Sequence, residues 1–279
     1  MRCQTASVTT VAALVRACHP EPAVAVTAIA GALAAGAGAP VVPVAVAFLS
    51  GQLATGWSND WIDRDRDLRT GRPDKPVATG LLAPATVRSA AALAALACVP
   101  LSLALGLRPG LAHLLAVVSA LSYNAALKSS PGSFLPYALS FALLPNVVVL
   151  ASPEGGLAPS WATAAGALLG VGAHLANALP DLEGDLATGV TGLPHRLGRP
   201  ASTALMAALL LAATALLAYG PGDPGALGLA VLAVAAVLTA YGIALARRPG
   251  SRAAFLAAVA VAVLDVALLV ARGAELSAG

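Results

Sequence analysis

The sequence predicts an all-α integral membrane protein, a multi-pass bundle of about nine transmembrane helices around a central cavity. Three observations lead to this fold class. Hydrophobic residues make up 58% of the 279 residues, and the mean hydropathy is +0.83. Charged residues make up only 10%, against about 25% in an average soluble domain. Apolar segments long enough to cross a bilayer recur along the whole chain. One soluble core could not bury this much apolar surface, so the composition excludes a water-soluble enzyme and a disordered chain.

Each predicted span is an apolar segment of about the 20 residues that a helix needs to cross a membrane. The nine spans are residues 20–37, 40–59, 83–106, 109–125, 133–151, 160–180, 200–219, 225–246 and 252–271. They are separated in order by GAGAP, a polar stretch at 60–80, GLRPG, KSSPGS, SPEGG, a polar stretch at 181–199, GPGDPG and RRPGS. We expect residues 1–279 to form a single membrane domain, with a juxtamembrane segment at 1–19 and cytoplasmic motif loops at 60–80 and 181–199.

The basic residues predict the orientation of the chain in the cell membrane, because cytoplasmic segments carry an excess of lysine and arginine. With nine spans and a cytoplasmic N-terminus, 14 of the 16 basic residues lie on the cytoplasmic side, and only Arg108 and Arg272 lie on the other. One span more or fewer would destroy this separation. The net charge of +3 gives no indication of a nucleic-acid partner, and the three cysteines show neither a disulfide pattern nor a metal-ligand spacing.

Eight of the 13 acidic residues lie in two polar segments, one ending the second predicted span and the other ending the sixth. Residues four apart share a face of a helix, so each segment predicts a stripe of one amide and two carboxylates. The first stripe is Asn59, Asp63 and Asp67, and the second is Asn177, Asp181 and Asp185. Both spans run toward the cytoplasm, so we expect the stripes to face each other near that surface. This placement is typical of a parallel internal repeat.

Facing carboxylates and amides are hard oxygen ligands that suit Mg²⁺, which usually bridges a few carboxylates to substrate phosphates. Carboxylates alone would repel a diphosphate. Two or three Mg²⁺ ions, with arginine and lysine side chains, would neutralise it and favour its departure. A second interpretation treats these charges as solvated loop residues with Arg64, Arg66 and Arg69 as ion-pair partners. Asp65 and Glu183 lie off the stripes, and we expect them to be solvated or paired.

These motifs resemble those of the UbiA superfamily of intramembrane prenyltransferases. The family pattern NDxxDxxxD is matched by Asn59, Asp60, Asp63 and Asp67, and the second DxxxD pattern by Asp181 and Asp185. A Y-x4-K element between the motifs resembles Tyr123 to Lys128, and a basic, proline- and glycine-containing element resembles residues 72–80. The span number, the length and the motif order also agree, so the resemblance covers nearly the whole chain. Lys75 departs from the commoner Arg-Pro, which keeps the charge but loses the bidentate fork.

The resemblance implies a UbiA-type fold and Mg²⁺-dependent transfer of a prenyl group from an isoprenyl diphosphate to a lipophilic or aromatic acceptor, with release of diphosphate. Membrane lipid is a further expected partner. It implies catalytic roles for Asp63, Asp181, Lys128 and Tyr123. The metal ligands would be Asn59, Asp60, Asp63, Asp67, Asp181 and Asp185. The diphosphate ligands would be Asn59, Arg72, Lys128, Arg16 and Asn177.

Two other functions remain open at this point. An intramembrane terpene cyclase would ionise the same prenyl diphosphate and let a double bond of the substrate itself attack, and the metal motifs do not distinguish it from a transferase. A secondary transporter could also have nine spans and a parallel repeat, but its ion-binding residues should lie near the membrane midplane. Asp265, an ionisable residue inside the ninth span, has no role that the motifs assign.

Overall fold

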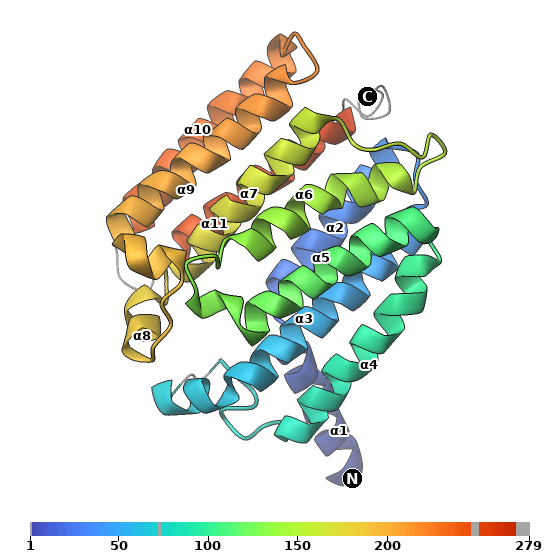
Figure 1. The fold of residues 1–279 in the computed structure, drawn as a ribbon. Coiled ribbons are helices and arrows are strands. Elements are labelled where there is room, and N and C mark those ends of the chain that lie inside the picture. The colour runs from blue at the N-terminus through green and yellow to red at the C-terminus, as the bar shows by residue number, and fades with distance from the viewer. Residues whose placement is uncertain (1, 72–73, 247–250, 272–279) are drawn as a thin grey trace.

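The computed structural model describes residues 2–71, 74–246 and 251–271, which form helices joined by short turns, with no strand among them (Figure 1). The all-α prediction is confirmed. Two helices lie outside the predicted spans, α1 (Arg2–Ala17) and α8 (Leu182–Ala187), and a short 3-10 turn, η1 (Leu127–Ser129), follows the fourth span. The other helices of the described residues match the nine predicted spans one by one. They are α2 (Pro20–Gly36), α3 (Val41–Thr70), α4 (Pro84–Leu103), α5 (Leu107–Ala125), α6 (Leu135–Leu150), α7 (Ser160–Ala178), α9 (Leu193–Tyr219), α10 (Gly225–Ala246) and α11 (Ala253–Ala271).

Several of these helices are long and apolar enough to cross a bilayer. Among the described residues, the length and hydropathy of α3, α4, α9 and the segment Gly225–Leu245 of α10 satisfy both requirements. Three shorter apolar helices, α2, α6 and the Leu256–Ala271 segment of α11, accompany them. These helices fit the membrane character that the composition predicts. Which end of the bundle faces the cytoplasm stays a prediction.

The first carboxylate motif lies on a helix rather than in a loop. The sequence places the end of the second span near residue 59, whereas α3 continues through Thr70 and ends at Gly71, whose φ of 64° terminates the helix in the left-handed conformation. Residues 60–70 of the predicted motif loop at 60–80 are therefore helical. The stripe of Asn59, Asp63 and Asp67 lies along one face of this continuous helix, as the four-residue spacing predicts.

The second motif differs, and the prediction of a continuous helical stripe is wrong there. Helix α7 ends at Ala178, and α8 begins only at Leu182. Pro180 contributes to the break because it has no backbone N–H to donate the next helical hydrogen bond, although Leu179 before it keeps helical dihedral angles of φ −58° and ψ −41°. Asn177 therefore lies at the end of α7, Asp181 in the turn, and Asp185 within α8.

The two motifs lie at the same end of the bundle (Figure 1). Helices α3, α5 and α7 all finish there, since they correspond to the second, fourth and sixth spans and alternate in direction with α4 and α6. The α5–α6 connection containing η1 and the short helix α8 complete this end. The order of the spans therefore brings three separate chain segments to one place.

The junction between α1 and α2 packs directly on α3. A Cβ atom at Gly56 would lie 2.1 Å from the carbonyl oxygen of Cys18, so only glycine permits this approach. The indole Nε1 of Trp57 also donates a hydrogen bond to the carbonyl oxygen of Leu14 at 2.9 Å. These contacts fix the N-terminal helix against α3 one turn before the first carboxylate stripe.

We predict that Gly56→Ala destabilises the protein, because the added methyl group must push the backbone of Cys18 away from α3. The apparent thermal midpoint in detergent should fall by about 5 °C, corresponding to roughly 1–3 kcal/mol for an overpacked site. Gly31→Ala is the matched control, since a Cβ atom there meets its neighbours at ordinary distances of 3.8 and 3.9 Å in the middle of α2. Equal midpoints for the two variants would contradict the proposed packing.

Candidate active site

Burial separates the carboxylates of the first motif into two groups. Asp60, Asp63 and Asp67 are only 1%, 4% and 2% exposed, whereas the side chain of Asp65 is 74% exposed and pairs with Arg64 at 3.3 Å. A buried carboxylate is costly unless opposite charges or hydrogen bonds compensate it. The interpretation as solvated loop charges therefore fits Asp65 but not the three buried residues.

Two cations compensate Asp63. The ammonium group of Lys128, in η1, forms an ion pair with Oδ1, and Arg66 Nη2 lies 2.8 Å from Oδ2. Lys128 reaches α3 because α5 ends at Ala125 and the 3-10 turn directs the next residues toward it. Burial lowers the pKa of Lys128 to about 8, and the negative charge of Asp185 acts in the opposite direction.

Lys75 occupies the other side of the first stripe. Its Nζ lies 3.5 Å from Asp60 Oδ1, 3.9 Å from Asp67 Oδ2 and 3.4 Å from Asn59 Oδ1. The lysine is 7% exposed, although it comes from the turn that follows α3. It therefore contributes a buried positive charge to the motif, as its match to the basic element in the sequence suggests.

Arg66 connects the two motifs. Besides its contact with Asp63, its Nε lies 3.7 Å from Asp67 Oδ1, and its Nη1 lies 3.8 Å from Asp185 Oδ1 on α8. His195 Nε2 lies 3.3 Å from the other oxygen of Asp185. The predicted site residues did not include Arg66 or His195. The available signal for Arg66 was its position three residues after Asp63, where side chains meet on a helix.

An asparagine that the motifs did not single out positions Asn59. Asn124 Nδ2 donates hydrogen bonds to the Thr55 carbonyl at 2.9 Å and to Ser58 Oγ at 2.8 Å, and its Oδ1 accepts one from Asn59 Nδ2 at 3.3 Å. Asn59 Nδ2 also lies 3.2 Å from Asp63 Oδ2. Asn124 belongs to the Y-x4-K element, so this element supplies a support for the first stripe as well as Lys128.

Three rings form an aromatic cluster beside these charges. The ring centroid of Tyr123 lies 5.1 Å from that of Tyr137 and 5.6 Å from that of His174, and Tyr137 and His174 are 5.0 Å apart. His174 Nε2 is 3.0 Å from Ser133 Oγ, and the Tyr137 hydroxyl pairs with the side chain of Asn177. The cluster therefore joins the Tyr123–Lys128 element to the start of the second motif.

The remaining predicted site residues are less closely assembled. Arg16 is exposed near the end of α1, and Asp181 is half-buried in the turn before α8. Arg72 lies outside the described residues. Off the stripes, Glu183 is exposed and pairs with Arg199 at 2.6 Å, and this hydrogen-bonded partner lowers the pKa of its carboxyl group. Glu183 therefore behaves as the paired surface charge that the sequence predicts.

The oxygens of the first stripe have capacity for a hard metal ion. Both carboxylate oxygens of Asp60 and Oδ2 of Asp67 are buried and make no hydrogen bond of good geometry among the described residues, although Lys75 lies within ion-pair distance of both residues and the Val77 backbone approaches Asp60. Among residues 2–71, 74–246 and 251–271, no group of three or more acidic, histidine or cysteine side chains is arranged so that it could hold a metal ion. The basic side chains lie between the carboxylates. The donor chemistry therefore fits Mg²⁺, provided that these side chains move aside.

The model of the UbiA prenyltransferase family matches residues 23–270. The chain belongs to the UbiA prenyltransferase family. A search of curated proteins gave no match.

Solved structures of UbiA homologues share the fold. The apo structure of a UbiA homologue from Aeropyrum pernix K1 matches with a TM-score of 0.70 and 21% identity, covering 90% of this chain and 98% of that one. A homologue from Archaeoglobus fulgidus bound to GPP and Mg²⁺ matches with a TM-score of 0.71 and 16% identity, covering 96% of this chain and 100% of the other. A solved structure of digeranylgeranylglyceryl phosphate synthase matches with a TM-score of 0.61 and 17% identity, covering 94% of this chain and 96% of the other. At these low sequence identities, the structural likeness shows that the chain shares the fold of these homologues.

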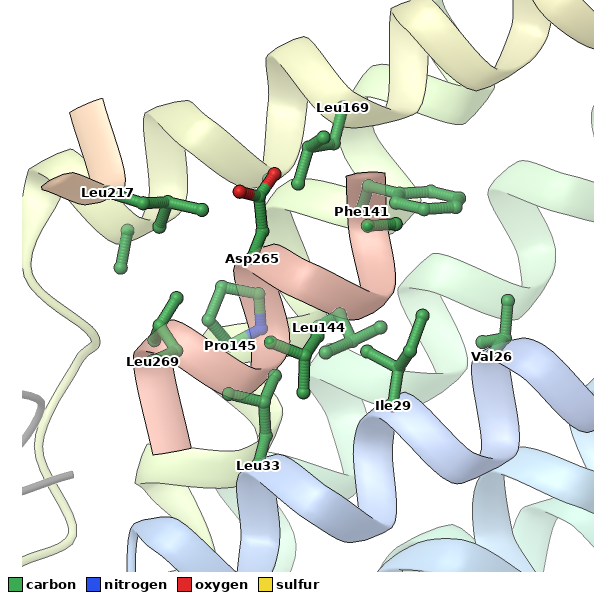
Figure 2. A pocket seen from close by; sticks show the side chains of 14 residues that line it. Val26, Ile29, Leu33, Phe141, Leu144, Pro145, Leu169, Leu217, Asp265 and Leu269 are labelled. Atoms are coloured by element: carbon green, nitrogen blue, oxygen red, sulfur yellow. The ribbon is translucent and has the colours of Figure 1, made fainter. Parts of the chain in front are cut away.

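This UbiA-family chain also has a small apolar cavity of about 50 Å³ between α2, α6, α7, α9 and α11 (Figure 2). Asp265 lines it among Leu33, Phe141, Leu169 and Leu217. The residue is 1% exposed, and among the described residues its carboxylate oxygens make no hydrogen bond of good geometry, although the side chain of Thr214 lies close enough to interact with them. A carboxylate in such surroundings costs stability, and nothing in its contacts connects it to the two motifs.

We predict that Asp265→Leu raises the apparent thermal midpoint in detergent. Leucine removes two buried oxygens whose only nearby polar partner, within the described part of the chain, is the Thr214 side chain at poor geometry, and the adjoining cavity offers space for its extra volume. The expected gain is about 1–3 kcal/mol, the scale of an unsatisfied buried polar group. Asp65→Leu is the control, because it removes an exposed carboxylate and should leave the midpoint nearly unchanged. A midpoint lowered by Asp265→Leu would contradict this assessment and indicate that the carboxylate makes a necessary interaction.

Proposed function

We propose that the protein transfers a prenyl group from an isoprenoid diphosphate to a lipophilic aromatic acceptor, with Mg²⁺ and with release of diphosphate. We place the reaction at the cytoplasmic end of the bundle in the cell membrane. The observation that carries the proposal is the contact of Arg66 with both motifs, 2.8 Å from Asp63 and 3.8 Å from Asp185. It supports a single site between α3 and α8.

The metal would be held by the oxygen ligands of the two motifs. In the first motif these are Asn59, Asp60, Asp63 and Asp67, and in the second Asp181 and Asp185. Bound Mg²⁺ would supply positive charge that stabilises the departing diphosphate. Solved structures of the Archaeoglobus fulgidus homologue contain Mg²⁺ with GPP or with DMAPP, which supports this choice of metal and substrate class.

Basic residues would bind the diphosphate itself. Lys128 and Arg66 are the best placed, because each already contacts Asp63 from a different element. With metal bound to the carboxylates, the cationic groups of Lys128 and Arg66 would become available for the phosphate oxygens. Arginine offers a bidentate fork and lysine a compact charge. We extend this role to Arg16, Arg72 and the Asn177 amide on the strength of the sequence resemblance.

The aromatic cluster would surround the reacting carbon. The bond between C1 of the prenyl chain and the diphosphate oxygen breaks, and the electron pair leaves with the diphosphate. The allylic cation that remains is stabilised by the faces of nearby rings, here those of Tyr123 and Tyr137. A ring carbon of the acceptor then forms a bond to C1, and the acceptor loses a proton. The packed rings also exclude water, which would otherwise capture the cation.

We predict that Asp63→Asn and Asp181→Asn each lower turnover by about two orders of magnitude, the scale of losing one electrostatic partner of the transition state. Both substitutions nearly preserve side-chain volume while removing an anionic metal ligand. Asp65→Asn is the matched control from the same helix, since its side chain is 74% exposed, and it should remain near wild type. The measurement is diphosphate release from GPP and DMAPP at saturating Mg²⁺ with a membrane lipid extract, and chelation by EDTA should abolish it reversibly.

Near-native turnover of both stripe variants would contradict the two-motif mechanism. The products distinguish the neighbouring functions. A prenylated acceptor detected by mass spectrometry supports the transferase, whereas a hydrocarbon formed without any acceptor would establish a terpene cyclase. Uptake of a labelled divalent ion into proteoliposomes without turnover of prenyl diphosphates would instead establish a transporter.

A further inference from the structure

The junction between α1 and α2 brings a histidine to the first carboxylate stripe. His19 lies between the two helices with φ 56° and ψ 69°, and it is the only non-glycine residue with positive φ among the described residues. Side chains with a Cβ atom rarely adopt this conformation, which persists only where surrounding contacts enforce it. The strained position therefore suggests that the placement of this side chain matters.

The contacts that enforce the conformation come from α3. The carbonyl of Cys18 lies against Gly56, and the carbonyl of Leu14 accepts a hydrogen bond from Trp57 at 2.9 Å. Gly56 precedes Asp60 by four residues, one turn of the helix. The junction is thus docked directly beside the stripe, and it directs His19 toward the charged residues.

The imidazole of His19 contacts Lys75. Its Nε2 lies 2.9 Å from Lys75 Nζ. A lysine ammonium group donates hydrogen bonds but has no lone pair to accept one, so the histidine must accept at Nε2 and carry its hydrogen on Nδ1. The same ammonium lies within 3.4–3.9 Å of oxygens of Asn59, Asp60 and Asp67. Because lysine is a flexible chain with a rotatable ammonium group, a further acceptor restricts where the charge lies.

We infer that His19 is a positioning residue that holds the Lys75 ammonium inside the first carboxylate stripe. The inference rests on the proposed function, because it assumes that the stripe binds a divalent cation and a diphosphate. Without the histidine acceptor, the Lys75 side chain can swing toward solvent and leave the stripe more negative. A divalent cation should then bind more tightly and a diphosphate more weakly, since one positive charge has left the site.

The test uses His19→Gly, which removes the imidazole and also suits the positive φ. The first measurement is the affinity of the purified protein for Mn²⁺, a paramagnetic substitute for Mg²⁺, without substrate. The second is the affinity for inorganic pyrophosphate at saturating Mn²⁺. We expect Mn²⁺ to bind about tenfold more tightly and pyrophosphate about tenfold more weakly, as for the loss of one nearby charge.

Matched variants separate positioning from a structural role. His19→Gln offers an amide oxygen as acceptor and should keep both affinities within about twofold of wild type. Lys75→Met should reproduce the effect of His19→Gly, and the double variant should not exceed Lys75→Met alone, because the two residues act through one charge.

Each other outcome overturns the inference. If His19→Gly weakens both ligands, or if its effect adds to that of Lys75→Met, the histidine acts through the structure in general and not through the lysine. If the wild-type protein binds no Mn²⁺, the proposed function itself fails. That result is seen before any variant is made, so the two failures are distinguishable.

Discussion

At the motif-bearing end of the bundle, three buried carboxylates must be compensated by cations in a protein that has few charges. Asp60, Asp63 and Asp67 are each less than 5% exposed, and burial of an uncompensated carboxylate would cost several kcal/mol. Their cations come from separate elements: Lys128 from the 3-10 turn after α5, Lys75 from the turn after α3, and Arg66 from α3 itself. The charges can be compensated only if these elements meet. Electrostatics therefore specifies how the motif-bearing end of the bundle is assembled.

Under the proposed function, the same arrangement would allow a site for metal and diphosphate to exist before either is bound. In the absence of ligands, the ammonium and guanidinium groups occupy the positions between carboxylates. A divalent cation can replace them as the partner of the carboxylates, and the displaced groups then serve an anionic substrate. The charge balance is kept in both states, which avoids the penalty of an unpaired buried ion.

The sequence predicted the fold well because its signals are strong and local. Apolar segments separated by charge, glycine and proline located nine helices, and four-residue spacing located the stripe on α3. The second motif was predicted less well. The same spacing suggested a continuous helical face, but Pro180 separates α7 from α8, and its effect outweighs the periodicity.

Contacts between distant segments account for the parts of the site that sequence reasoning missed. Arg66 was considered only as a surface ion-pair partner, since nothing local indicates that it reaches Asp185 across the bundle. His195 and Asn124 carry no motif of their own, and their roles follow from packing. His19 is similar, because its approach to Lys75 requires the close contact of Cys18 with Gly56. Such residues become visible only when the helices are placed together.

The most direct test of the central claim, that both motifs bind metal around one diphosphate, is an experimental structure with Mn²⁺ and a slowly reacting geranyl thiodiphosphate. Anomalous scattering would locate the ions independently of the protein density. We expect Mn²⁺ at Asp63 and Asp67 and at Asp181 or Asp185, with the diphosphate between them and Lys128 turned from Asp63 toward a phosphate oxygen. Metal at only one motif, or a diphosphate bound elsewhere while Arg66 still joins Asp63 to Asp185, would contradict it.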